Sequence, residues 1–158
     1  MTNDRITCMT DRQSVDTFLA QRTLAIAGVS RGGKKFGNSI MKELRGKGYT
    51  MHPVHPEAEE VDGVRCVQSL KDLPEGVGGL VLVVKPEQTE KLVREAHEAG
   101  ISRVWMQQGA ASDTAVAFCR DQGMDVVAGE CILMFSEPVS GIHGFHRWLW
   151  KIFGKLPR

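Results

Sequence analysis

Short apolar runs and stretches of helical spacing alternate along this chain. The apolar runs have the length and composition of strands covered on both faces, and they occupy residues 23–28, 49–54, 79–84, 103–107 and 124–127. The stretches between them place apolar residues three or four positions apart and end in glycine, which predicts helices. One helix ends near residue 47, two others cover residues 86–99 and 112–122, and a shorter one is expected at 14–20.

This regular alternation predicts an α/β fold, because parallel strands need crossover connections that helices supply. We expect a Rossmann-like, doubly wound parallel sheet of five strands in the order 3-2-1-4-5, within a single domain. The chain then divides into an N-terminal segment with a short helix (1–22), the Rossmann-like domain (23–131) and a C-terminal tail (132–158).

The tail differs from the rest of the chain in charge and aromatic content. Residues 138–158 contain four basic side chains and no acidic one, and residues 145–153 place aromatic and aliphatic side chains at helical spacing. We expect this helix to dock on protein, either on its own sheet, on a second copy in a homodimer or on a partner protein. Membrane association is not expected, because one short helix with four charges anchors weakly.

Net charge, cysteine spacing and the length of the apolar runs exclude several classes of function. A formal net charge of +1 gives no overall footprint for nucleic acid. The four cysteines are scattered without paired spacing, which indicates reduced thiols rather than a disulfide framework or a zinc ribbon. No apolar run has the length of a transmembrane helix or the form of a signal peptide. We therefore expect a cytoplasmic protein.

The carboxyl ends of the strands are the segments to examine for chemistry, since ligands bind there in open α/β sheets. The first strand is followed by a glycine-rich basic turn, Gly-Val-Ser-Arg-Gly-Gly-Lys-Lys-Phe-Gly at residues 28–37, and then by a helix. Unpaired backbone N–H groups and the positive end of the helix dipole suit a phosphate group at such a position.

Three phosphate ligands are compatible with this turn in different degrees. Gly28, Gly33 and Lys34 match the spacing of a nucleoside-triphosphate loop. The next residue is Lys35 instead of the Ser or Thr that holds magnesium, and the third strand ends in Lys85 instead of an acidic metal ligand. These departures count against NTP hydrolysis.

A dinucleotide is the second alternative. Ser30 occupies the second glycine position of Gly-x-Gly-x-x-Gly, and residues 52–56, which end the second strand, contain no acid for the adenosine ribose. NADP, which accepts a basic neighbour, fits better than NAD. An NADP-type oxidoreductase or redox-sensing module therefore stays open as an alternative function.

Coenzyme A is the third alternative, because its 3′-phosphate and pyrophosphate need several positive or donor groups. Arg31, Lys34 and Lys35 lie in the turn, His55 ends the second strand and Lys85 ends the third. Charge-assisted hydrogen bonds from such groups are the strong kind for phosphate, and CoA does not require the missing ribose acid.

Four segments also carry a family resemblance. They read Ile-Ala-Gly-Val-Ser at 26–30 with Gly37 beyond, Val-His-Pro at 54–56, Val-Lys-Pro-Glu-Gln at 84–88 and Val-Trp-Met-Gln-Gln-Gly at 104–109. Over residues 24–131 the chain resembles the CoA-binding domain family, small stand-alone proteins similar to the N-terminal domain of the succinyl-CoA synthetase alpha subunit.

The resemblance implies roles for individual residues. The turn from Gly28 to Ser30 and Lys34 would hold the phosphates, His55 and Pro56 would flank the adenine ribose, and residues 85–86 would line the pantetheine path. The full set expected to bind the cofactor is Gly28, Val29, Ser30, Arg31, Lys34, Lys35, Gly37, Asn38, His55, Pro56, Lys85, Pro86, Gln107 and Gly109.

The expected function is to bind CoA or an acyl-CoA in a binding or regulatory role. No nucleophile, base and orienting group converge in these motifs, so no catalytic residue is assigned. No metal site is expected either, since His143 and His146 lack the other ligands and the paired spacing of a zinc site. Cys131 is expected to be an inert thiol.

Overall fold

A computed structural model of the protein describes residues 10–136. In this range five parallel strands form one sheet, namely β1 (Thr23–Ala27), β2 (Thr50–Val54), β5 (Gly79–Leu82), β6 (Arg103–Met106) and β7 (Asp125–Ala128). The helices are α1 (Arg12–Leu19), α2 (Phe36–Gly46), α3 (Pro86–Glu98) and α4 (Asp113–Asp121), with the short 3-10 turns η1 (Leu70–Asp72) and η2 (Ile132–Met134). The hairpin β3 (Glu60–Val61) and β4 (Val64–Arg65) forms a separate two-stranded sheet. The predicted Rossmann-like α/β fold is confirmed.

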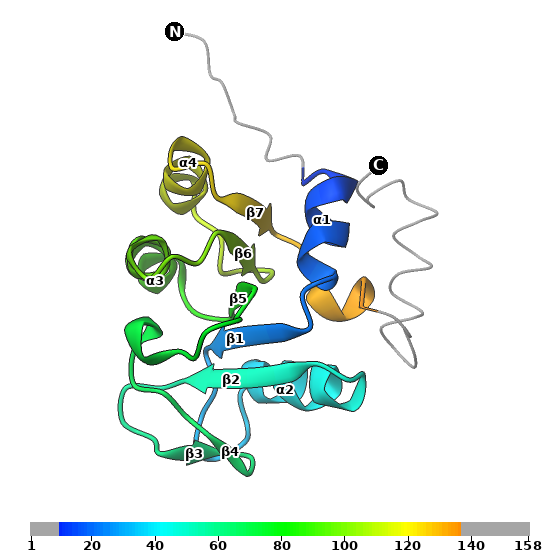
Figure 1. The fold of residues 1–158 in the computed structure, drawn as a ribbon, viewed down its shortest axis with the longest axis vertical. Helices are drawn as coiled ribbons and strands as arrows, with labels where there is room; N and C mark the ends of the chain where they lie inside the picture. Colours follow the sequence, from blue (N-terminus) through cyan, green and yellow to red (C-terminus); the bar gives the residue numbers. More distant parts are fainter. Residues whose placement is uncertain (1–9, 137–158) are drawn as a thin grey trace, which may run out of the picture.

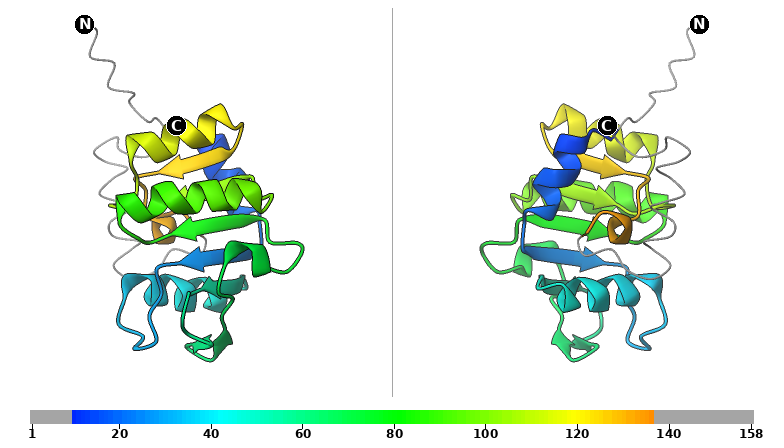
Figure 2. Two further views of the ribbon diagram at one scale, coloured as in Figure 1. Left: turned by 90° about the vertical axis from the view of Figure 1, so that its left-hand side faces the viewer. Right: turned by 90° about the vertical axis from the view of Figure 1, so that its right-hand side faces the viewer.

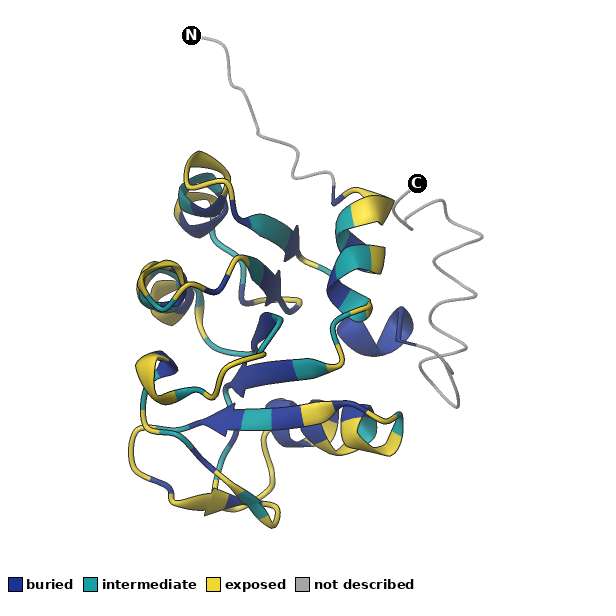
Figure 3. Cartoon of the chain, viewed as in Figure 1, coloured by how far each residue is buried: buried dark blue, intermediate teal, exposed yellow. Residues whose placement is uncertain are grey.

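Helices cover both faces of the sheet and make a three-layer molecule (Figure 1). On one face α1, α2 and η2 pack against Leu24, Ile26 and Trp105; on the other, α3 and α4 pack against the alternate residues of the same strands. The strands point in one direction, so their carboxyl ends share one edge (Figure 2). Side chains of the central strands are buried almost throughout (Figure 3).

The predicted strand order is wrong at one position. The sheet runs β2-β1-β5-β6-β7, which in terms of the five main strands is 2-1-3-4-5 and not 3-2-1-4-5. The third strand thus lies beside the first, where the Val83 N–H donates to the Ala27 carbonyl at 2.9 Å. The second strand lies at the edge.

Pro53 is the physical reason for this edge position. The Pro53 carbonyl accepts a hydrogen bond from the Val67 N–H at 3.0 Å on the outer side of β2. In a strand, the backbone N–H and C=O groups of one residue point to the same side. Because the Pro53 carbonyl points outward, the position without an N–H donor also lies on the outer side of β2. A proline is tolerated there only if no full strand pairs with it. β2 therefore ends the sheet.

The hydrophobic core continues past the expected start of the tail. Ile132, Leu133 and Phe135 are buried against Trp105 and α2, and the Lys47 Nζ donates to the Ser136 carbonyl at 3.1 Å. The helix expected at 145–153, and residues 143 and 146, lie outside the described residues. Within residues 10–136 no helix has both the length and the apolar character needed to span a bilayer.

The start of α2 touches the end of β1 through backbone atoms alone. A Cβ at Gly37 would lie 2.4 Å from the Gly28 carbonyl oxygen, which is too close for any side chain. Helix and strand can meet here only because position 37 is glycine.

We predict that Gly37→Ala lowers the free energy of unfolding by about 1 to 3 kcal/mol, because the clashing atoms belong to the backbone and cannot rotate away. Gly46→Ala is the matched control in the same helix, since no atom lies within 4 Å of a Cβ there; it should be neutral or stabilising by up to about 1 kcal/mol. Urea unfolding of both variants measures the difference. Equal midpoints would contradict the close contact.

Candidate functional site

The loop between β1 and α2 has a shape that glycines impose. Gly28 has φ +108°, and a Cβ on it would lie 2.1 Å from the Val83 carbonyl oxygen. Gly33 has φ +67°, and its N–H donates to the Ser30 carbonyl at 3.2 Å, closing a tight turn. The loop is therefore held against the end of β5, and its chain direction reverses at the glycines.

Asn38 fixes the inside of the loop. Its side chain is 2% exposed; Oδ1 accepts from the Ser30 N–H at 2.8 Å, and Nδ2 donates to the Ser30 carbonyl at 2.9 Å. Nδ2 also donates to the Asp62 carboxylate at 2.9 Å, which ties the loop to the hairpin of β3 and β4. This buried side chain therefore holds both backbone groups of Ser30 in one orientation.

Three basic side chains lie near the start of α2, together with the carboxylates of Glu57 and Asp62. Lys34 and Lys35 are exposed, and Arg31, also exposed, forms an ion pair with Glu57 at 3.6 Å. The first turn of α2 contains no acidic residue, and no side chain caps it. The positive end of the helix dipole is therefore not neutralised by the helix itself.

His55 shapes the segment after β2. Its Nδ1 accepts hydrogen bonds from the N–H groups of Glu57 at 3.1 Å and Ala58 at 2.9 Å. Pro56 is exposed beside it. The structure therefore gives His55 an internal hydrogen-bonding role in addition to its place at the sheet edge.

The end of β5 lies directly beside the loop, as a consequence of the corrected strand order. Lys85 is exposed and precedes α3, in which Pro86 is the first residue. In the first turn of α3 Thr89 is wholly buried, and its Oγ1 has no hydrogen-bond partner among the described residues.

The Trp-Met-Gln segment anchors the turn that follows β7. The Trp105 Nε1 donates to the Glu130 carbonyl at 2.9 Å, and the Gln107 Oε1 accepts from the Ile132 N–H at 3.1 Å. Both side chains are 1% exposed or less. Gly109, with φ +84°, lies exposed in the loop after β6.

Glu130 lies at the same edge of the sheet, just after β7, and is not among the residues predicted from the sequence to bind the cofactor. It is half-buried, and its Oε2 is hidden with no partner among residues 10–136. Burial raises the pKa of its carboxyl to about 7. The sequence offers one signal for this residue, namely its position just after the last strand, where ligands bind in such sheets. The neighbouring residues in the sequence do not indicate that the carboxyl is buried.

The expected residues thus fall into four groups along one edge. The loop residues and Asn38 are in direct contact, Lys85 and Pro86 follow the adjacent strand, and Gln107 and Gly109 lie one strand further. His55 and Pro56 lie on the other side of β1, after β2. Phe36 was also missed; it begins α2 and is 47% exposed, the one large hydrophobic side chain so exposed in the described part of the chain.

Among the residues that the structure describes, cysteines and acidic residues form no second site. Cys66, Cys119 and Cys131 are buried free thiols. Burial raises the pKa of Cys119 to about 11, and burial together with Glu60 raises that of Cys66, so neither is an activated thiol. In residues 10–136 no three His, Cys, Asp or Glu side chains gather to hold a metal ion.

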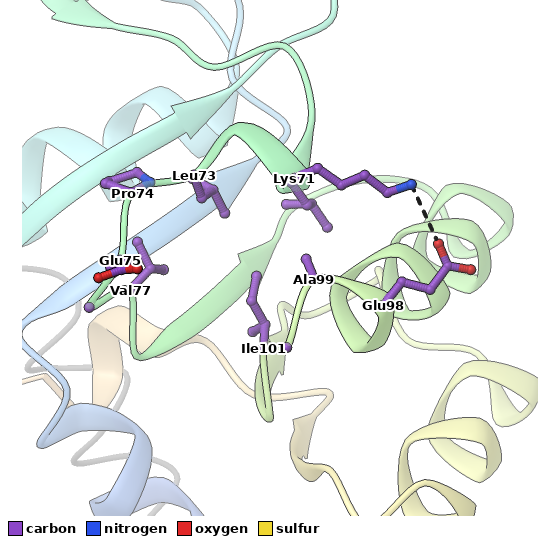
Figure 4. A pocket seen from close by; sticks show the side chains of 11 residues that line it. Lys71, Leu73, Pro74, Glu75, Val77, Glu98, Ala99 and Ile101 are labelled. Carbon is purple, nitrogen blue, oxygen red and sulfur yellow. Dashed lines mark ion pairs between the residues drawn. The ribbon is translucent and has the colours of Figure 1, made fainter.

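A hollow of about 480 Å³ lies at the opposite end of the sheet (Figure 4). Leu73, Val77 and Ile101 line it, and a Lys71–Glu98 ion pair of 3.9 Å lies at its rim. None of the residues predicted to bind the cofactor lines this hollow. The candidate site is therefore the carboxyl edge, where the glycine loop lies.

The raised pKa of Glu130 makes the stability of the fold pH-dependent. Between about pH 4.5 and pH 7 the folded state holds a proton that the unfolded state has lost, so the free energy of unfolding falls as pH rises through this window. Glu130→Gln removes this loss and should be more stable than the wild type at pH 8 by on the order of 1 kcal/mol, since a half-exposed carboxyl is partly screened.

Urea unfolding at pH 5 and pH 8 measures this effect as the difference in the free energy of unfolding between Glu130→Gln and the wild type. Glu59→Gln, at an exposed position, is the control and should show the same pH dependence as the wild type. If Glu130→Gln also follows the wild type at both pH values, the carboxyl is ionised and solvated in the folded state.

Comparison with known proteins places this geometry in a family. The model of the CoA binding domain matches residues 22–137. An uncharacterized protein, YneT of Bacillus subtilis, is 26% identical over 111 residues, which are 70% of this chain and 82% of the relative. The alpha subunit of an ADP-forming acetate–CoA ligase from Pyrococcus furiosus is 26% identical over 75% of this chain, but the match spans 28% of that subunit.

Two solved structures share the fold. A conserved hypothetical protein from Pyrococcus furiosus has a TM-score of 0.68 and 37% identity, over 70% of this chain and 96% of that protein. A hypothetical protein from Pyrococcus horikoshii has a TM-score of 0.74 and 30% identity, over 82% of this chain and 92% of that protein. The family match covers most of the chain, so this protein belongs to the CoA-binding domain family.

Proposed function

We propose that this protein binds coenzyme A or an acyl-CoA through the glycine loop after β1, in a binding or regulatory role. The observation that carries the proposal is the loop itself. Gly28, Gly37 and Asn38 hold it rigidly, and exposed Lys34 and Lys35 stand at an uncapped helix start. Such a loop offers backbone donors and positive charge to phosphate groups without reorganising.

The family and its neighbours support the choice of CoA over other phosphate ligands. One relative that matches this chain is the alpha subunit of an acetate–CoA ligase. Exposed Phe36, next to the two lysines, adds an aromatic face on which a purine base can stack. Lys85 follows the neighbouring strand and would meet the pantetheine arm as it leaves the loop.

Thermal shift with CoA, acetyl-CoA, NAD and NADP tests the proposal. A ligand that binds only the folded state stabilises it by about 2.7 kcal/mol at a hundred times its dissociation constant. CoA or acetyl-CoA should raise the melting temperature. A shift with NADP alone would overturn the proposal and favour an oxidoreductase or redox-sensing module.

We predict that Lys34→Ala weakens CoA binding about tenfold, the usual loss for one charge-assisted hydrogen bond to phosphate. Isothermal titration with CoA and dephospho-CoA identifies the phosphate. A larger loss for CoA assigns Lys34 to the 3′-phosphate, and equal losses assign it to the pyrophosphate. Lys42→Ala, exposed further along α2, is the control and should bind as the wild type does. If Lys34→Ala also binds both ligands as the wild type does, Lys34 is not a phosphate ligand.

Asn38→Ala should also weaken CoA, by several-fold, although Asn38 lies inside the loop. Without its bonds to Ser30 the free loop samples other conformations, and binding must then order it at a cost in entropy. Ser39→Ala, exposed at the next position, is the matched control. Unchanged affinity in a folded Asn38→Ala variant would mean that the loop does not need this side chain to be ordered.

A further inference from the structure

Three buried polar atoms in the described residues have no hydrogen-bond partner: Thr89 Oγ1, Gln107 Nε2 and Glu130 Oε2. Buried polar atoms are nearly always paired, so each exception needs an explanation. All three belong to residues that follow a strand of the main sheet at its carboxyl end. They therefore lie along the same edge as the glycine loop, but on the β5–β7 side of it.

Gln107 and Glu130 are close neighbours at this edge. The Gly129 N–H donates to the Met106 carbonyl at 3.1 Å, so the two chain segments run side by side where β6 and β7 end. Trp105 holds the Glu130 carbonyl and Gln107 holds the Ile132 N–H, so Glu130 lies between two anchored points. The backbone on both sides of the Glu130 side chain is thus held by the core; the residue as a whole is half-buried, and its Oε2 is hidden.

The Gln107 amide and the protonated form of the Glu130 carboxyl are both hydrogen-bond donors, and neither has an acceptor among the described residues. Nε2 of an amide can only donate. Burial, and no charged neighbour, raises the pKa of Glu130 to about 7, so a large share of its carboxyl groups carry a proton at neutral pH and donate as well. A cation would need an ionised carboxylate, and a phosphate would need positive charge. A neutral carbonyl oxygen fits both donors.

We propose that the ends of β6 and β7 form a carbonyl-binding subsite, in which Glu130, with Gln107 behind it, donates to an amide or thioester carbonyl of the pantetheine arm of a CoA derivative. This inference rests on the proposed function. β6 and β7 are two and three strands from β1, so the subsite is roughly 10 to 15 Å from the phosphate loop at the usual strand spacing. An extended pantetheine arm spans that distance.

The test compares three ligands on the full chain: CoA, acetyl-CoA and 3′-phosphoadenosine 5′-diphosphate, which has no pantetheine arm. We expect Glu130→Ala to weaken CoA, acetyl-CoA or both by about five- to thirtyfold, the range for one lost hydrogen bond to a partly buried group, and to leave the armless nucleotide unchanged. Glu130→Gln keeps an N–H donor and should bind all three ligands within about twofold of the wild type.

The pattern of losses identifies the carbonyl. A loss confined to acetyl-CoA assigns the thioester, and equal losses for CoA and acetyl-CoA assign an amide of the arm. Wild-type affinity of Glu130→Ala for both ligands overturns the subsite, as does an equal loss for the armless nucleotide. If the wild type binds none of the three ligands, the proposed function itself has failed, which is a different result.

Discussion

The end of β1, the end of β5 and the start of α2 meet with no space for a side chain between them. Gly28 faces the Val83 carbonyl, and Gly37 faces the Gly28 carbonyl. This double contact fixes the position of the loop relative to the sheet, and it directs the first N–H groups of α2 toward the edge. Asn38 then fills the inside of the loop. The rest of the candidate site depends on this contact, because it fixes the glycine loop relative to β5 and therefore relative to the ends of β6 and β7 in the same sheet.

Much of the architecture follows from local pattern. Fully apolar runs such as residues 79–84 are typical of strands covered on both faces. The predicted helices begin and end within about two residues of the expected positions. The order of strands is a different kind of property, because periodicity says that a strand is buried and not beside which strand. Here the chain did contain the answer. Pro53 leaves β2 without an outer donor, which is incompatible with the interior position that the order 3-2-1-4-5 requires.

The candidate site separates in the same way into local and distant contributions. The glycine loop is a contiguous motif and could be predicted from residues 28–37 alone. Asp62 reaches Asn38 from 24 residues away, and Trp105 holds Glu130 from 25 residues away. Contacts of this kind depend on strand order and on the exact turn after each strand. The Trp-Met-Gln segment was visible as a motif, but its work of holding the turn after β7 was visible only in three dimensions.

The two ends of the sheet edge offer opposite chemistry. Around β1 the basic side chains of Arg31, Lys34 and Lys35 are exposed, whereas after β6 and β7 the Gln107 Nε2 and the Glu130 Oε2 are buried without a partner among the described residues. An inorganic anion or a plain nucleotide would use only the first end and would leave the donors of Gln107 and Glu130 unpaired, at a cost that buried polar groups rarely bear. A ligand with an anionic head and a neutral, carbonyl-bearing arm satisfies both ends at once. On the proposed function and the proposed subsite, the edge would favour such a ligand through the spacing of its two kinds of donor, because neither end alone distinguishes it from commoner phosphates.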